Sequence, residues 1–165
     1  MESFVMWWSS HLGHIVSPLF STFLVSMLPI VELRGALILS SLLKIPLKQA
    51  VLLAIIGNML PIPFLIIGIE NLINWLSEHN LNKVVTIIHH KVEKHRHEIE
   101  TVGFWGLVIF VGIPLPGTGA WTGSIIAGLL GMNRWRATLA IFLGVCLAAL
   151  IMTTISYGII GHIVK

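Results

Sequence analysis

The chain has 165 residues, of which 56% are apolar and 10% are charged, and its formal net charge is +3. Soluble domains carry about 25% charged residues, so this composition excludes an ordinary soluble globule. The small positive charge gives no reason to expect nucleic-acid binding. The sequence contains no aspartate, which argues against Mg²⁺-dependent phosphotransferases because these hold their metal through several carboxylates.

Long uncharged runs predict an integral membrane protein with one domain, residues 1–165. Residues 49–69, 101–133 and 137–164 contain no Lys, Arg, Asp or Glu, and about 20 apolar residues suffice to cross a hydrocarbon core roughly 30 Å thick. Residues 1–15 lack the basic start and small-residue cleavage site of a signal peptide. We expect them to form an interfacial segment.

The first predicted element after this segment is a re-entrant helical hairpin over residues 16–43. Two apolar pieces, residues 16–28 and 33–43, flank the sequence LPIVE, which contains Pro29. At 1.5 Å per residue, pieces of about 12 residues reach only about 18 Å, too short to cross but long enough to reach mid-depth and return. Residues 47–73 then predict an ordinary transmembrane helix.

Residues 79–101 predict an amphipathic linker helix that lies in the membrane interface or packs on the helix bundle. Its apolar residues share one helical face, and Lys94–Glu98 and Arg96–Glu100 form i,i+4 pairs on the other. The linker side carries most Lys and Arg, so we expect it to be cytoplasmic in a multi-pass protein of the cell (inner or plasma) membrane. The linker histidines do not converge on one face, and we predict no metal site and no cofactor. The histidines concerned are His89, His90, His95 and His97.

A second re-entrant hairpin is predicted over residues 102–132, followed by a transmembrane helix over 134–164. Its two apolar pieces flank PLPGTG, where Pro114, Pro116, Gly117 and Gly119 end the first half-helix and let the chain turn. Such backbone is tolerated at membrane depth only when protein or a polar cavity surrounds it. The alternative is a single span kinked by the Pro-Gly sequence.

The two hairpins belong to an internal repeat. A shift of 87 residues superposes Pro29 on Pro116, Phe23 on Phe110 and Gly57 on Gly144. One crossing helix in each unit would make the hairpins enter from opposite faces, as in many transporters with inverted repeats. The sequence thus predicts an all-α membrane protein of two inverted repeats whose hairpin tips meet near the midplane.

Glu32 and Arg34 are the candidate substrate-binding side chains, because an ionisable residue at membrane depth costs at least about 2.5 kcal/mol on insertion scales. Both follow the first break. Two half-helices begin near Glu32 and Gly119, and helix N-termini together with a guanidinium suit an anion. Glu32 could carry a proton. The alternative is that both side chains point to the interface or pair across a subunit contact.

Further candidates surround these two side chains. Gly117 and Gly119 would let backbone approach a ligand, and Thr118 and Trp121 would line the same pocket. Asn58 and Thr122 are secondary lining candidates, with a hydrogen bond between helices as the alternative for Asn58. The small residues 119, 123, 127 and 131 form a stripe for close helix packing or dimerisation. We predict no catalytic residue and no enzyme activity.

Two motifs resemble a known family. PIVELRGALILS and GIPLPGTGAWTGSIIAGLLGM resemble the signature pair of the small multidrug export family, with similarity over about residues 20 to 160. That family is remotely similar to DedA and VTT-domain membrane proteins, which implies two opposed re-entrant hairpins and lipid movement, including recycling of polyprenyl-phosphate carriers. Glu32 matches the membrane-embedded glutamate of DedA proteins. The second hairpin of those proteins carries arginines, whereas residues 102–133 contain none here, so Arg34 would have to replace them.

These observations predict a transporter of an amphiphilic anion, a phosphate-bearing lipid, with proton coupling through Glu32. The alternatives are a proton-coupled exporter of small cations or drugs, which a fixed charge at Arg34 disfavours, and a membrane scaffold that transports nothing. The expected partners are a membrane lipid or a small amphiphilic substrate. So small a chain is also compatible with a homo-oligomer.

Overall fold

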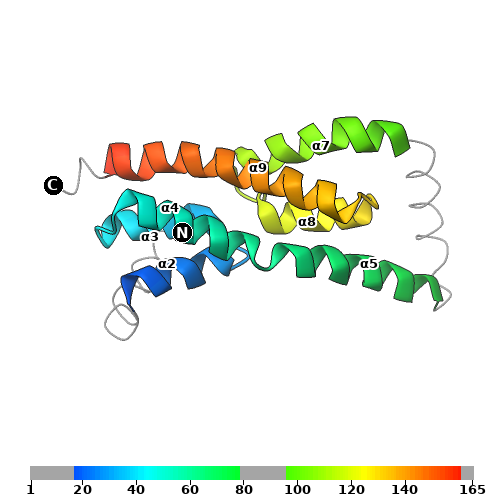
Figure 1. Ribbon diagram of the computed structural model, residues 1–165, viewed down its shortest axis with the longest axis horizontal. Helices are drawn as coiled ribbons and strands as arrows, with labels where there is room; N and C mark the ends of the chain where they lie inside the picture. Colours follow the sequence, from blue (N-terminus) through cyan, green and yellow to red (C-terminus); the bar gives the residue numbers. More distant parts are fainter. Residues whose placement is uncertain (1–16, 79–95, 161–165) are drawn as a thin grey trace.

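The computed structural model describes residues 17–78 and 96–160, and these residues are helical with no strand among them (Figure 1). The predicted all-helical class is therefore confirmed for this part of the chain. The helices, in chain order, are α2 (Pro18–Met27), α3 (Glu32–Leu42), α4 (Leu47–Met59), α5 (Ile62–Glu78), α7 (Arg96–Gly112), α8 (Ala120–Leu129), α9 (Arg134–Thr153) and the π-helix η1 (Thr154–Ile160).

Two long helical segments, one formed by α4 and α5 and the other by α9 and η1, run along the molecule (Figure 1). The short helices pack against these segments at opposite ends of the molecule. Helix α2 packs on α3 and α4, while α3 also contacts α9. At the other end α7 packs on α9, and α8 packs on both α5 and α9. The turn between α2 and α3 and the turn between α7 and α8 both lie near the middle of the molecule.

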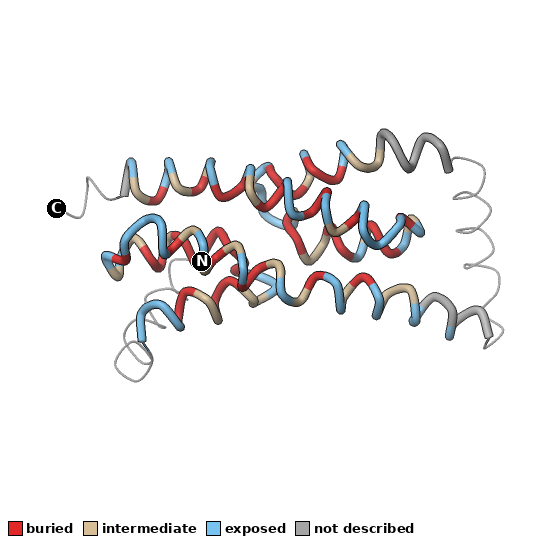
Figure 2. The backbone as a smooth tube through the Cα atoms, in the orientation of Figure 1, coloured by how far each residue is buried: buried red, intermediate tan, exposed pale blue. Residues whose placement is uncertain are grey.

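The long helices suit a membrane in length and in surface. Leu47–Leu72 has 26 residues, Arg134–Gly158 has 25, and each has a mean hydropathy of 2.4. At 1.5 Å per residue each exceeds the roughly 30 Å of a hydrocarbon core. Figure 2 shows buried residues facing inward on the helices and exposed residues facing outward. Many of the outward residues are large and apolar, among them Leu52, Phe64 and Leu150.

Both long helical segments are less regular than the sequence predicted. The expected helix over 47–73 is interrupted at Leu60 and Pro61, between α4 and α5. Pro61 has no N–H to donate, and its ring clashes with the carbonyl four residues back, so the α-helical ladder cannot pass through it. The expected helix over 134–164 changes to π geometry at Thr154.

The ends of the predicted elements fall partly outside the described residues. Residues 1–16, 79–95 and 161–165 are not described. They contain the predicted interfacial segment, most of the predicted linker helix with His89, His90 and His95, and the last residues of the final span. Helix α7 begins at Arg96, so it covers both the end of the predicted linker helix and the start of the predicted second hairpin.

Short helices flank both breaks. Helices α2 and α8 have 10 residues each, so each is about 15 Å long, half the thickness of a hydrocarbon core. Helix α2 ends because Leu28, which precedes Pro29, is extended with ψ 135°, and a residue before proline avoids the helical region.

The 87-residue shift of the sequence also relates backbone features. Helices α3 and α8 end 87 residues apart, and each is followed by a left-handed residue, Lys44 (φ 54°) and Gly131 (φ 61°). The Ile45 N–H donates to the Ser40 carbonyl and the Met132 N–H to the Ala127 carbonyl, both at 3.0 Å. This is the Schellman ending in both places. The next helices, α4 and α9, begin 87 residues apart as well.

Each long helix approaches its neighbour through a glycine. An ideal Cβ on Gly57 of α4 would lie 2.6 Å from the Phe23 carbonyl of α2. One on Gly144 of α9 would lie 2.8 Å from the Val108 carbonyl of α7. Only glycine permits such close packing of two helix backbones, which is typical of membrane helices.

Replacing Lys44 with glycine is expected to raise the free energy of unfolding by about 1 kcal/mol. A left-handed residue with a Cβ costs roughly that much more than glycine, and Gly131 fills the repeat-related position. Thermal unfolding of the purified protein in detergent measures the effect. The control Lys48→Gly lies in the first turn of α4, where glycine lowers helix stability. A loss of stability in Lys44→Gly comparable to that of the control would contradict the prediction.

Candidate functional site: two helix breaks that meet

The first break is the turn from α2 to α3. Helix α2 ends at Met27 and α3 begins at Glu32. Glu32 has φ 50°, a left-handed conformation that is uncommon outside glycine and costs about 1–3 kcal/mol. Backbone strain of this kind persists only where surrounding contacts hold it.

The second break is the loop from α7 to α8, residues 113–119. Gly117 (φ 84°) and Gly119 (φ 133°) have positive φ angles. The Thr118 N–H donates to the Leu115 carbonyl at 3.2 Å, which closes a turn. Helix α8 begins at Ala120 with Gly119 as its N-cap, at the start that the sequence predicted.

The carboxylate of Glu32 sits on the N-terminus of α8. The backbone N–H of Trp121 donates to Oε1 at 3.2 Å, and Glu32 is only 5% exposed. An ideal Cβ on Gly119 would lie 2.0 Å from Oε2, so the carboxylate occupies the space that any other side chain at position 119 would need. A negative charge is favoured here because the first N–H groups of a helix carry positive partial charge.

Arg34 holds the other side of the same loop. Its Nη2 donates to Thr118 Oγ1 at 2.8 Å and to the Ile113 carbonyl at 3.3 Å, and its Nη1 donates to the Leu115 carbonyl. Ile113 directly follows the last residue of α7, where partial negative charge collects, and Leu115 lies two residues further along the loop. Arg34 is 7% exposed, so its charge is matched by oxygens of the second break.

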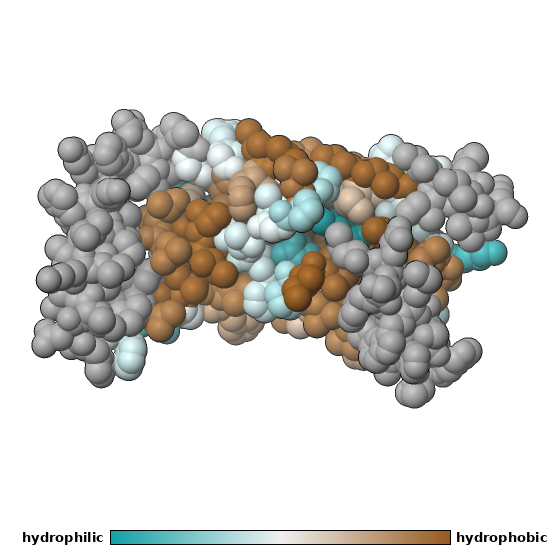
Figure 3. Space-filling view, turned by 180° about the vertical axis from the view of Figure 1, so that it is seen from behind, coloured by the Kyte–Doolittle hydropathy of each residue, from teal (hydrophilic) through white to brown (hydrophobic). Residues whose placement is uncertain are grey.

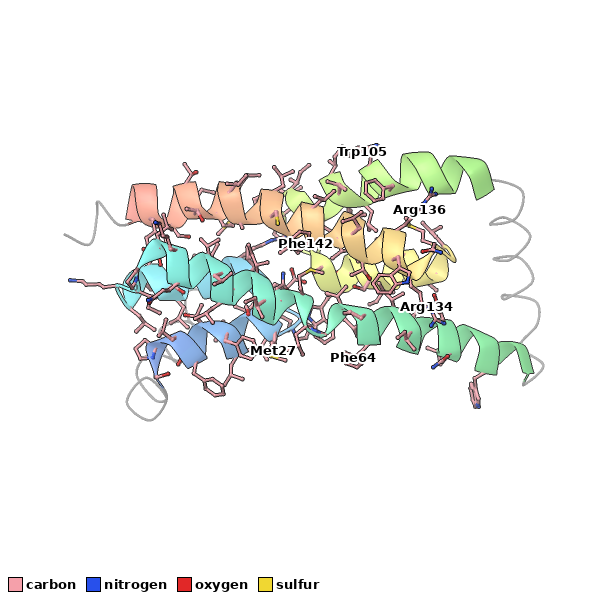
Figure 4. All side chains as sticks on the ribbon, in the orientation of Figure 1. Met27, Phe64, Trp105, Arg134, Arg136 and Phe142 are labelled. Atoms are coloured by element: carbon pink, nitrogen blue, oxygen red, sulfur yellow. The ribbon has the colours of Figure 1, made fainter. Side chains whose placement is uncertain are left out.

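Trp121 makes a reciprocal contact from the second break to the first. Its ring Nε1–H donates at 3.2 Å to the carbonyl of Met27, which is the last residue of α2. Figure 4 labels Met27 near the middle of the molecule, where α2 ends. We call the group formed by Glu32, Arg34, Thr118 and Trp121 the clasp. Its contacts join the two breaks: Glu32 binds the start of α8, Trp121 binds the end of α2, and Arg34 binds the loop that follows α7.

The structure therefore brings together Glu32, Arg34, Thr118, Gly119 and Trp121, all of them candidates from the sequence. Glu32 and Arg34 bind different parts of the second break, in keeping with their i,i+2 spacing on different faces of a helix. The groups predicted to hold a substrate anion, Arg34 and the start of α8, hold oxygens of the protein in this structure.

The remaining candidates lie around the clasp or away from it. Gly117, Pro29 and Pro116 are exposed in the two turns, and Pro114 is half-buried. Thr122 is half-buried on α8; Asn58 on α4 is 2% exposed, and its Oδ1 has no hydrogen-bond partner among the described residues.

Sequence reasoning missed the carbonyl groups of Met27, Ile113 and Leu115 as partners of the clasp. Every residue carries a carbonyl, so no residue type marks these positions. The usable signal for Met27 and Ile113 was their place at or next to the ends of α2 and α7, where helix carbonyls lack an intrahelical partner. Leu115 lies in the loop beyond α7, so its carbonyl carries no such signal.

One face of the molecule has a polar area midway along its length. Figure 3 shows a hydrophilic area near the middle with apolar areas on both sides. The exposed turn residues Pro29, Ile30, Pro116 and Gly117 belong to the two breaks, which lie at the same level in Figure 1.

Residues 32–151 match the sequence model of a family described as "Putative small multi-drug export protein". The matched segment starts at Glu32 and includes the whole second break, so it contains every side chain of the clasp. No curated protein and no solved structure matches the chain.

Proposed function

The chain belongs to this family of small multi-drug export proteins, and from that premise we propose that it is a membrane transporter of an amphiphilic anion with the clasp as its substrate site. The observation that carries the proposal is the contact of the Glu32 carboxylate with the N-terminus of α8. A helix N-terminus is a ready-made anion site, and here the protein's own carboxylate fills it.

Proton transfer to Glu32 would let a substrate anion replace the Glu32 carboxylate at the N-terminus of α8. A protonated carboxyl group is a weaker acceptor than a carboxylate, so it would release the Trp121 N–H. Arg34 and the start of α8 would then form a positive site that a substrate phosphate could occupy. In this cycle one proton is bound for each anion bound, and both are released when Glu32 returns to α8. We favour a phosphate-bearing lipid because its tails suit the apolar surface on either side of the breaks.

We further propose that the two hairpins are re-entrant and inverted, as in remotely similar DedA and VTT-domain proteins. The half-thickness of α2 and α8, their position at opposite ends of the long helices and the backbone repeat all support this arrangement. The protein would then lie in the cell membrane as a multi-pass protein with residues 79–95 on the cytoplasmic side, in line with the distribution of Lys and Arg.

A homo-oligomer would cover the exposed turns. Residues 115–117 are exposed and non-helical, and non-helical backbone at mid-depth is tolerated only against protein or water. A second copy facing this surface would shield it from lipid and enclose a wet path to Glu32.

The family description favours a second candidate, export of a small cation or drug in exchange for protons. In that mechanism a cation would replace the proton on Glu32. Arg34, two residues away, disfavours it because a fixed positive charge repels cations.

Flux into proteoliposomes with an imposed pH gradient separates these functions. We expect Glu32→Gln to reduce flux of a fluorescent short-chain phosphatidate at least about tenfold, the effect of losing one charged hydrogen-bond partner. Arg34→Lys should reduce it as well, since lysine cannot donate to three oxygens in the geometry of a guanidinium. The control Glu70→Gln, on α5 and outside the clasp, should retain flux.

Flux of a cationic dye that is lost only in Glu32→Gln would support the cation exporter and contradict the anion transporter. Flux that is indifferent to all three substitutions, or that equals flux in empty liposomes, would contradict transport through the clasp.

A further inference from the structure

An open groove lies between α4 and α9, at the end of the molecule where α4 begins and α9 ends. Its volume is about 570 Å³, within the usual range of about 300–1,000 Å³ for ligand sites. The lining residues are Leu47, Lys48, Val51, Leu52 and Ile55 of α4 and Cys146, Ala149, Leu150 and Thr153 of α9.

The walls of the groove are mostly hydrocarbon, and they carry one charged residue, at the end where α4 begins. Leu52 (60% exposed) and Leu150 (69% exposed) form the outer rim, whereas Ala149 at 3% exposed lies at the bottom. Lys48 is exposed in the first turn of α4. From Lys48 to Ile55 the groove follows two turns of helix, about 10 Å. It therefore offers a cation near the end of a long membrane helix and an apolar channel leading from it toward the middle.

Small side chains on α9 leave this space open. Cys146, Ala149 and Thr153 stand 87 residues after Met59, Ile62 and Ile66 in the other repeat. Ile62 and Ile66 are large and fully buried, at 0% and 1% exposure. The other repeat thus has isoleucine at the two positions where the groove has alanine and threonine.

We propose that this groove binds one hydrocarbon chain of an anionic membrane lipid, whose phosphate is held by Lys48. The proposal concerns a resident lipid and goes beyond transport at the clasp, because the groove contains none of the clasp residues. A cation beside an apolar channel matches the two parts of a phospholipid, and a lysine near the membrane surface attracts anionic lipids.

A second copy of the chain fits the groove less well. Closed dimers are two-fold, so the same patch faces itself and brings both copies of Lys48 together. No acidic residue lines the groove to offset that repulsion. The charge of the groove therefore points to a phosphate rather than to another protomer.

Native mass spectrometry of the full chain, purified from an equimolar mixture of phosphatidylglycerol and phosphatidylcholine, tests the proposal. We expect one retained lipid, with phosphatidylglycerol favoured about fivefold, the effect of one lysine near an anionic headgroup. Lys48→Gln should reduce that preference to about one, while the control Lys44→Gln, exposed at the same end but outside the groove, keeps it.

Filling the groove tests the site of the hydrocarbon chain. Ala149→Ile introduces the residue that the other repeat carries, and Thr153→Ile does so one turn further along; both should lose the retained lipid. Thr138→Ile, on the same helix but outside the groove, should keep it. Circular dichroism checks that each variant is folded.

Three outcomes would overturn the proposal: no retained lipid in the wild type, equal retention in the filled and control variants, or a dimer that only the filled variants lose. None of these results depends on flux through the clasp, so the resident lipid and the transport function can fail separately.

Discussion

Replacing Gly119 with alanine should lower the free energy of unfolding by about 3 kcal/mol or more. The added Cβ would lie 2.0 Å from Oε2 and 2.7 Å from Cδ of Glu32, so the carboxylate must leave the N-terminus of α8. The residue would also keep φ 133°, which alanine rarely adopts. Overpacking and backbone strain each cost about 1–3 kcal/mol. Unfolding of the purified protein in mixed micelles measures the loss.

Gly117→Ala separates the two causes. Gly117 also has a positive φ (84°), but a Cβ added at this position would meet no atom within 4 Å. Only the backbone cost remains, about 1–2 kcal/mol. If the two alanine variants were equally stable, the close contact between Glu32 and Gly119 would be wrong.

Replacing Arg34 with methionine should cost about 3 kcal/mol or more. Methionine keeps much of the volume but donates no hydrogen bond, so the oxygens of Ile113, Leu115 and Thr118 lose a charged donor. Those oxygens keep other donors, among them the Leu115 N–H on the Ile113 carbonyl and the Thr118 N–H on the Leu115 carbonyl, but each lost hydrogen bond to a charged group is worth about 1.5–3 kcal/mol. The same unfolding assay measures the effect, and limited proteolysis at residues 113–119 shows whether the loop has become accessible.

Arg134→Met is the matched control. Arg134 pairs with Glu70 at 2.6 Å, but its side chain is 57% exposed, and Figure 4 shows it near the surface beside α5. Exposed ion pairs contribute at most about 1 kcal/mol. Equal losses from the two substitutions would mean that the burial of Arg34 does not contribute to stability.

The breaks and their residues could be predicted from the sequence because they violate strong rules. Proline and glycine within an uncharged run, and Glu32 and Arg34 beside one of these breaks, are costly in a membrane and therefore conspicuous. The 87-residue shift was visible in Pro29 and Pro116 and also relates the ends of α3 and α8 and the starts of α4 and α9.

What escaped prediction depends on where the chain places groups that carry no sequence signal. Pro61 was present in the sequence, but an interrupted crossing and a straight one have the same composition. The partners of Arg34 are carbonyl groups, and which of them face it is set by the turn of residues 113–119. The groove between α4 and α9 depends on the relative sizes of residues that are far apart in the chain.

Thiol labelling at the second break tests the central claim most directly, namely that the loop held by the clasp borders water at mid-depth and that the clasp opens when Glu32 loses its charge. Cys146 is the only cysteine, so Cys146→Ala gives a background for a single Leu115→Cys substitution. Leu115 is 55% exposed in the loop that Arg34 holds. Ile125→Cys, 40% exposed on α8, provides the lipid-facing control. The account predicts that a charged, membrane-impermeant thiol reagent modifies the Leu115→Cys protein in liposomes but not the Ile125→Cys protein, and that adding Glu32→Gln speeds the modification. Equal protection of both positions, with and without Glu32→Gln, would contradict it.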